Sequence, residues 1–164
     1  LSVAEERPVD RVAAIKRKFT YRVRHFDEKR EDLAVTSYCR KRAPNGAEDF
    51  IRVFRNQRAV LAPMQGQERT TWLQVVQIGD VALVGVPAEF FTKLGQEIKR
   101  RSPFRYTYIA ELANDWIGYI PDKAAFALGG YQTWTGLHSF ADPETGEKIV
   151  AQAVQMLREL HGGK

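Results

Sequence analysis

Apolar and polar residues alternate near the start of the chain and then change to helical spacing. Over residues 12–24, aromatic and β-branched residues alternate with basic ones, and this period of two predicts a half-exposed strand. Helical patterns follow over 27–42 and 47–62, the second after the turn-forming pair Asn45-Gly46. The second helix is expected to bury one face. The residues on that face are Phe50, Val53, Phe54, Gln57 and Leu61.

The middle of the chain predicts a hairpin and then a strand–helix–strand unit. Runs of strand-forming residues at 70–78 and 81–86 flank Gly79-Asp80, a pair typical of a two-residue hairpin connection. Pro87 ends the second run and is expected to open a helix. An apolar strand over 106–112 follows. The apolar face of the helix between the two strands consists of Phe90, Phe91, Leu94 and Ile98.

The last helix has the clearest pattern. Asp142 is a typical N-cap residue, and Pro143 suits the first helical position. The apolar face is formed by Ile149, Ala153, Met156, Leu157 and Leu160. Together these elements predict an α/β fold, in which a mixed sheet with a β-hairpin and a βαβ unit is flanked by helices.

Length and composition narrow the possible classes. The chain has 164 residues, 44% hydrophobic and 27% charged, so it is one globular domain or a portion of a larger one, and not disordered as a whole. No apolar run approaches the roughly 18 residues of a membrane-spanning helix. Cys39 is the single cysteine, and the three histidines (His25, His138 and His161) lack zinc-finger spacing. The sequence begins at Leu1 rather than at methionine, so we expect it to be processed or cut from a longer chain.

The net charge of +5 raises the question of a nucleic-acid partner. Most of the excess lies in the first 58 residues, where acidic residues are interleaved with the basic ones. No nucleic-acid-binding motif accompanies the charge. A surface of mixed sign is more typical of a solvated face, or of one that meets another part of a larger protein. We therefore expect no nucleic-acid partner.

Side chains able to do chemistry are expected at one edge of the sheet. Glu89 would lie in the first turn of the predicted helix, where the helix dipole favours an ionised carboxylate. The next strand runs into a loop with Trp116 and Tyr119. Parallel strands end at the same edge, so Glu89 and Tyr119 should converge there. The flexible pair Gly129-Gly130 can bring Tyr131 to the same cleft.

Purely structural roles are the alternative for the same residues. A glutamate at the start of a helix stabilises its own N-terminus. Trp116 and Tyr119 also suit a core position, in which the ring is buried and the polar group of the side chain makes a hydrogen bond. Periodicity alone does not decide between these interpretations.

Three motifs occur in a characteristic order. They are the segment 79–90, which contains Val86-Pro87-Ala88-Glu89-Phe90, then Leu112-Ala113-Asn114 with Tyr119, and then Gly130-Tyr131. They resemble the closing part of the catalytic domain of the neutral/alkaline non-lysosomal ceramidase family. The resemblance is strongest over residues 70–136 and looser over the first 60. Members of this family are zinc-dependent amidohydrolases that cleave the amide bond of N-acylsphingosines.

The resemblance implies roles for three residues. The zinc-binding glutamate of the family's Pro-Gly-Glu-Phe motif falls on Glu89, and the zinc-binding second tyrosine of its Asn-x-Tyr-x-x-Tyr motif falls on Tyr119. The tyrosine twelve positions later, a catalytic side chain near the scissile carbonyl, falls on Tyr131. A carboxylate suits zinc, and a phenol hydroxyl can stabilise a developing oxyanion.

The sequence departs from the family pattern around these residues. Ala88 replaces a glycine, Phe91 a threonine, Trp116 the first tyrosine of the Asn motif, and Gln132 a glutamate. The family's two histidine ligands and its serine-bearing segment lie upstream of the matched region, and His25 is in no matching motif.

The resemblance therefore implies a C-terminal portion of a larger catalytic domain. The upstream part of that domain would be its partner and would complete the zinc site. An N-acyl, ceramide-like substrate and an extracytoplasmic or secreted location are implied in the same way. The alternative is a non-catalytic binding or assembly module that keeps the family fold and uses its basic first third as a contact surface.

Overall fold

A mixed four-stranded sheet forms the centre of the computed structural model, which describes residues 8–162. Leu1, on which the expectation of a longer chain rests, lies outside these residues. The strand order is β1-β2-β3-β5, antiparallel from β1 to β3 and parallel between β3 and β5. The strands are β1 (Val12–Arg22), β2 (Glu68–Ile78), β3 (Val81–Gly85) and β5 (Tyr106–Ala110).

The predicted hairpin and strand–helix–strand unit are both confirmed. Gly79, with a φ of +58°, and Asp80 connect β2 to β3, and a glycine adopts this left-handed backbone without strain. Helix α3 (Thr92–Arg101) then connects the parallel strands β3 and β5. The α/β class expected from the sequence is therefore correct.

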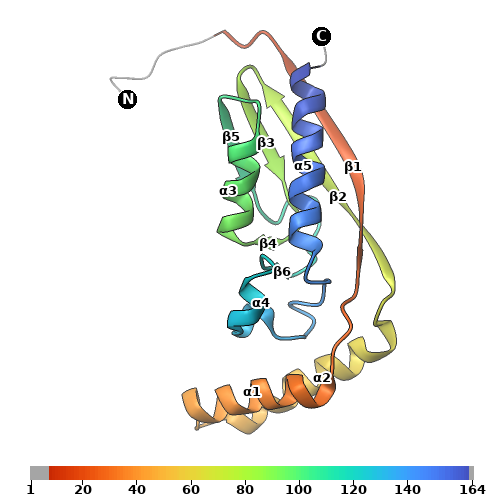
Figure 1. The fold of residues 1–164 in the computed structure, drawn as a ribbon, viewed down its shortest axis with the longest axis vertical. Helices are drawn as coiled ribbons and strands as arrows, with labels where there is room; N and C mark the ends of the chain where they lie inside the picture. Colours follow the sequence, from red (N-terminus) through yellow and green to blue (C-terminus); the bar gives the residue numbers. More distant parts are fainter. Residues whose placement is uncertain (1–7, 163–164) are drawn as a thin grey trace.

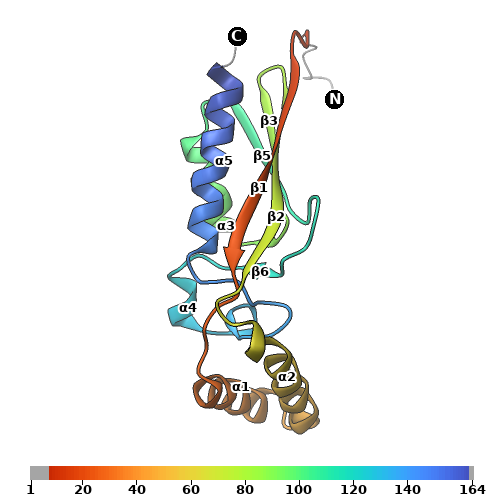
Figure 2. The same cartoon turned by 90° about the vertical axis from the view of Figure 1, so that its right-hand side faces the viewer.

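The remaining elements lie on one face and at one end of the sheet. Helices α3 and α5 cover one face, and the hairpin of α1 and α2, inserted between β1 and β2, projects from one end (Figures 1 and 2). A second, two-stranded sheet is formed by β4 and β6. These elements are α1 (Glu28–Arg42), α2 (Ala47–Leu61), η1 (Ala62–Met64), β4 (Glu89–Phe90), β6 (Tyr119–Ile120), α4 (Ala125–Leu128), η2 (Tyr131–Thr133) and α5 (Thr145–Gly162).

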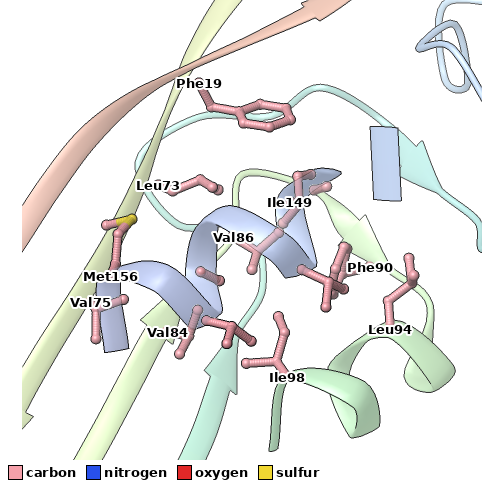
Figure 3. Close-up of a cluster of buried hydrophobic side chains, with 14 of the residues drawn as sticks. Phe19, Leu73, Val75, Val84, Val86, Phe90, Leu94, Ile98, Ile149 and Met156 are labelled. Atoms are coloured by element: carbon pink, nitrogen blue, oxygen red, sulfur yellow. The ribbon is translucent and has the colours of Figure 1, made fainter. Parts of the chain in front are cut away.

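The main core lies between the sheet and the two helices α3 and α5. Figure 3 shows Ile149 and Met156 of α5 meeting side chains from the strands and from α3. The whole apolar face predicted for the last helix is buried. Burying a large aliphatic side chain contributes about 1.5–3 kcal/mol, so this face holds the helix against the sheet.

The start of α5 differs slightly from the prediction. The helix begins at Thr145, two residues later than the first helical position expected at Pro143. Asp142 still caps the turn that leads into the helix, because its Oδ1 accepts the N–H of Glu144 at 2.9 Å and its carbonyl accepts the N–H of Thr145 at 2.9 Å.

Helix α2 buries a different face from the one predicted. Phe54 and Leu61 are buried as expected, but Phe50 and Val53 are 54% and 47% exposed. The buried positions are Ala47, Ile51, Phe54, Arg58 and Leu61. The predicted face was wrong because an apolar pattern does not count an arginine as a core residue.

Arg58 is fully buried because α1 supplies its counter-charges. Its guanidinium donates to both carboxylate oxygens of Glu28, at 2.8 and 2.9 Å, and to Asp32 at 2.8 Å. Hydrogen-bonded ion pairs of this kind let a charged side chain leave water. The pairing of α1 with α2 therefore decides which face of α2 is buried.

The face of the sheet opposite α3 and α5 has no helix over it among the described residues (Figure 2). Trp72 on this face is 40% exposed and Tyr108 is 54% exposed. The ammonium groups of Lys16 and Lys18 lie 5.2 and 5.9 Å from the centroid of the Trp72 ring. Between residues 8 and 162, no helix has the length and apolar character needed to cross a bilayer.

Candidate functional site

Glu89 lies in a strand and not in the first turn of a helix. The helix expected to open at Pro87 begins only after Phe91, because the chain stays extended through β4. The N–H of Glu89 donates to the carbonyl of Gly118 at 3.1 Å, and the N–H of Phe91 donates to that of Ile120 at 3.2 Å. These hydrogen bonds to a distant segment take the place of the bonds that a local helix would make. The prediction that a helix dipole favours the ionised carboxylate of Glu89 is therefore wrong.

Glu89 and Tyr119 share one cleft. β4 and β6 pair in parallel with these two residues as register partners, so both side chains point to the same side of the small sheet. Both line a pocket of about 380 Å³, together with Phe91, Lys93 and Gln132. A larger hollow, of about 650 Å³, is lined in part by Gly79 and Asp80 of the β2–β3 turn and contains none of the three predicted site residues. The two side chains converge as expected, and their roles as metal ligands stay predictions.

The electrostatics of the pair couple the phenol to the carboxylate. Burial raises the pKa of Tyr119, and the negative charge of Glu89 and a hydrogen bond with its carboxylate raise it further. Oε2 of Glu89 is buried and finds no hydrogen-bond partner within the described part of the chain. An unsatisfied polar atom of this kind typically costs about 1–3 kcal/mol, so it suits a position that a cation can fill.

Tyr131 lies beside Tyr119. The centroids of their rings are 5.8 Å apart, with an edge-to-face angle of 79°. Gly129 and Gly130, with φ values of +72° and +106°, turn the backbone just before Tyr131, as the sequence predicted. Tyr131 is 45% exposed and opens η2. Tyr131 therefore contacts Tyr119, but its side chain is not among those that line the pocket of Glu89 and Tyr119.

His138 belongs to the same cluster, and sequence reasoning missed it. It is 9% exposed, and its ring stacks on that of Tyr131 with a centroid distance of 4.4 Å and an angle of 25°. Burial lowers its pKa, and the hydrogen bond to the carbonyl of Tyr131 acts in the opposite direction. Its spacing from Tyr131 matches no metal or catalytic motif, so only the folded turn between them reveals the contact.

The loop that carries Tyr131 and His138 is packed against the helical hairpin. Trp134 is 7% exposed and lies edge-on to Tyr38 of α1, at 5.0 Å, and to Phe54 of α2, at 5.4 Å between ring centroids. These contacts belong to a second core, separate from the one under α5. Its members are Val35, Cys39, Ala47, Ile51, Phe54 and Trp134.

Polar contacts reinforce this packing. Glu31 of α1 accepts the N–H of Thr135 at 2.9 Å, and Gln57 of α2 accepts the N–H of Leu137 at 3.0 Å. The two helices therefore bind the backbone of the loop as well as its tryptophan. The first third of the chain, where the family resemblance is loosest, supports the loop of the candidate site.

Arg24, which follows β1, anchors the loop. It donates to the carbonyl of Thr133 at 2.8 Å and to the hydroxyl of Ser139 at 2.7 Å. Burial lowers its pKa to about 10, and the charges of Glu31 and Asp142 offset part of this effect. Arg24 therefore remains charged at neutral pH while it holds the two ends of the loop together.

This fold resembles that of solved ceramidases. One similar structure is of the neutral ceramidase from Pseudomonas aeruginosa, and another is of a ceramidase complexed with C2. Each matches 57% of this chain at 21% identity with a TM-score of 0.50. The matched part has a ceramidase-like fold. The resemblance seen in the three sequence motifs is thereby confirmed for the fold.

The extent of the match limits what the ceramidase-like fold shows. This chain spans 15% of the length of each of the two solved structures. No protein-family model and no curated protein matches the chain. The comparisons therefore establish an architecture, and activity has to be argued from the site.

The donor atoms of the site fit part of a zinc centre. Zinc binds carboxylate oxygens, and its protein sites use three or four protein ligands. Glu89 supplies a carboxylate with a buried, unpartnered oxygen, and Tyr119 supplies a phenol at its side. Over residues 8–162 no cluster of three or more His, Cys, Asp or Glu side chains is arranged to hold a metal ion. The two donors suit a zinc ion only if further ligands come from other polypeptide.

Proposed function

We propose that this chain is the C-terminal portion of the catalytic domain of a zinc-dependent amidohydrolase similar to neutral ceramidase. Its substrate is an N-acyl, ceramide-like amide. The upstream part of the same domain is its partner and brings the histidine ligands. The domain acts outside the cytoplasm, and this part of the proposal rests on the family resemblance alone.

One observation carries the proposal. Glu89 and Tyr119, far apart in the sequence, are register partners of a two-residue parallel pair, and the free oxygen of Glu89 is buried. A purely structural glutamate would be expected to have its oxygens hydrogen-bonded or in water. The ceramidase-like fold supports the same conclusion, because the motif that contains Glu89 is one of the three that carry the sequence resemblance.

Each of the three residues has a distinct role. Glu89 and Tyr119 would hold the metal, Glu89 through its carboxylate and Tyr119 through its phenol oxygen. When bound, zinc acts as a Lewis acid toward the substrate carbonyl. Tyr131 donates a hydrogen bond from its hydroxyl to the oxygen of the scissile carbonyl, on which negative charge develops. Its ring, edge-on to Tyr119, supports that placement.

A non-catalytic binding or assembly module is the second candidate. The open face of the sheet, with Trp72 and Tyr108 exposed, favours it. The basic first third is a weaker contact surface than its charge suggests, because many of its arginines pair with carboxylates of the same chain. These arginines are Arg17, Arg22, Arg40, Arg52, Arg55 and Arg58.

The test begins with the gene that encodes this chain. A histidine-bearing segment in frame upstream supports the catalytic proposal, and a gene without one supports the binding module. The complete domain is then purified, and its zinc content and hydrolysis of a ceramide are measured. Tyr131→Phe should lower kcat by about 10² to 10³ at unchanged zinc content, because it removes one oxyanion donor. Glu89→Ala should lower the zinc content.

Tyr108→Phe is the matched control for Tyr131→Phe. It removes the same hydroxyl from an exposed tyrosine on the open face of the sheet, and it should leave both kcat and zinc content unchanged. A Tyr131→Phe domain with the kcat of the parent protein would contradict the role given to Tyr131.

A further inference from the structure

His138 contacts both tyrosines of the site through different atoms. Its ring stacks on Tyr131, with centroids 4.4 Å apart, and its Nε2 lies 2.9 Å from the carbonyl oxygen of Tyr131. A carbonyl only accepts, so Nε2 carries the proton in this contact. The backbone carbonyl of His138 accepts the N–H of Tyr119 at 2.7 Å. A single residue therefore connects the two tyrosines.

The backbone around His138 is arranged for this connection. The N–H of Ser139 donates to the carbonyl of Gly136 at 2.9 Å, which closes the turn that contains His138. Gly118 has a φ of +80°, and a Cβ at this position would overlap the carbonyl oxygen of His138. A glycine at 118 is therefore needed for the strand of Tyr119 to come close enough to bond that carbonyl.

A third aromatic residue holds the stacked pair from the helical hairpin. The ring of Phe54 lies edge-on to His138 at 5.4 Å and edge-on to Tyr131 at 6.2 Å. His138 is buried, whereas Tyr131 is 45% exposed. Solvent restricts a half-exposed ring very little, so the neighbours on its buried side decide its orientation.

We infer that His138 is a positioning residue, whose ring and Nε2 hold Tyr131 beside Tyr119. A reacting group displaced by about 1 Å can cost about 10²-fold in rate, so such a residue matters without touching substrate. The inference rests on the proposed function only for the consequence in catalysis. The orientation of Tyr131 itself is a property of the chain and can be tested without metal or substrate.

The experiment is NMR of the 164-residue chain with labelled tyrosine side chains. Tyr131→Phe and Tyr119→Phe assign the two sets of ring signals, and amide hydrogen exchange reports the Tyr119 N–H. Three substitutions separate the two contacts of the histidine side chain. His138→Phe keeps a stacked ring and loses the hydrogen bond, His138→Gln keeps a donor and loses the ring, and His138→Ala loses both.

The expected result is that the ring of Tyr131 responds to the substitutions and the amide of Tyr119 does not. The nuclear Overhauser contacts between the rings of Tyr131 and Tyr119 should weaken in His138→Gln and in His138→Phe, which each keep one of the two contacts, and should be lost in His138→Ala. The Tyr119 amide should stay protected in all three, because its acceptor is a backbone carbonyl. His161→Ala, which removes a histidine that lies edge-on to Phe104, should leave Tyr131 unchanged.

Two results would overturn the inference. One is that the Overhauser contacts between the rings of Tyr131 and Tyr119 keep their parental strength in all three variants. The other is the loss of both these ring contacts and the Tyr119 amide protection in all three variants, since that would show a general role in folding. If His138→Ala alone fails to fold, the comparison of His138→Gln with His138→Phe decides the outcome. None of these results depends on zinc binding or hydrolysis, so they are separate from a failure of the proposed function.

Discussion

Replacing Trp134 with alanine should detach the loop of the candidate site from the helical hairpin. A buried tryptophan removes about 150–250 Å² from water, worth about 4–6 kcal/mol at about 25 cal/mol per Å². Residual compactness of the denatured chain lowers this by about 10–40%, which leaves about 2–5 kcal/mol. Trp134 is 7% exposed, so nearly all of this stabilisation should be lost.

The assay is urea unfolding followed by circular dichroism, together with amide hydrogen exchange. Trp134 belongs to the core of the hairpin and not to the core under α5. Exchange should therefore become faster in α1 and α2 than in α5. Trp116→Ala is the matched control, because Trp116 is 50% exposed and its loss should change stability by no more than about 0.5 kcal/mol. A loss below about 1 kcal/mol in Trp134→Ala, with α1 and α2 as protected as before, would refute the reasoning.

Three further predictions concern single side chains. Burial raises the pKa of the Cys39 thiol above its reference value of 9.0, so at about pH 8 a thiol reagent should modify the native chain much more slowly than the denatured one. The stability gained from burying the neutral thiol should be present below the reference value and be lost as the pH rises through the folded pKa. Asp142→Ala should lower the free energy of unfolding by about 0.5–2 kcal/mol in a thermal melt, and no change would contradict its capping role. Arg24→Met should cost about 1–3 kcal/mol in urea unfolding, because it leaves the acceptors at Thr133 and Ser139 without a donor, and Arg24→Lys should recover part of this.

Elements with their own apolar period could be predicted from the sequence. The β2–β3 hairpin combines two runs of strand-forming residues with Gly79-Asp80, and α5 combines a long apolar face with Asp142 before its first turn. In both cases the deciding information lies within one short stretch of chain. The convergence of Glu89 and Tyr119 was also predictable, because it follows from where the two parallel strands end.

Contacts between distant segments account for what could not be predicted. β4 has two residues and exists because the carbonyls of Gly118 and Ile120 accept the N–H groups of Glu89 and Phe91. The buried face of α2 depends on Arg58, which only the carboxylates of α1 make tolerable in the interior. His138 contacts Tyr131 because the chain turns back on itself between them, and no periodic pattern in the sequence predicts that turn.

A zinc titration of the isolated chain, followed by NMR, decides whether Glu89 and Tyr119 act as one metal-binding pair. We predict weak, saturable binding, since two oxygen donors are fewer than a zinc site requires. The carboxylate signal of Glu89 and the ring signals of Tyr119 should shift together with one midpoint, and Glu89→Gln should abolish the shift at Tyr119. Glu97→Gln, which removes an exposed carboxylate of α3, should change nothing. Tight stoichiometric binding that survives Glu89→Gln, or a titration that moves neither residue, would contradict the proposed metal pair.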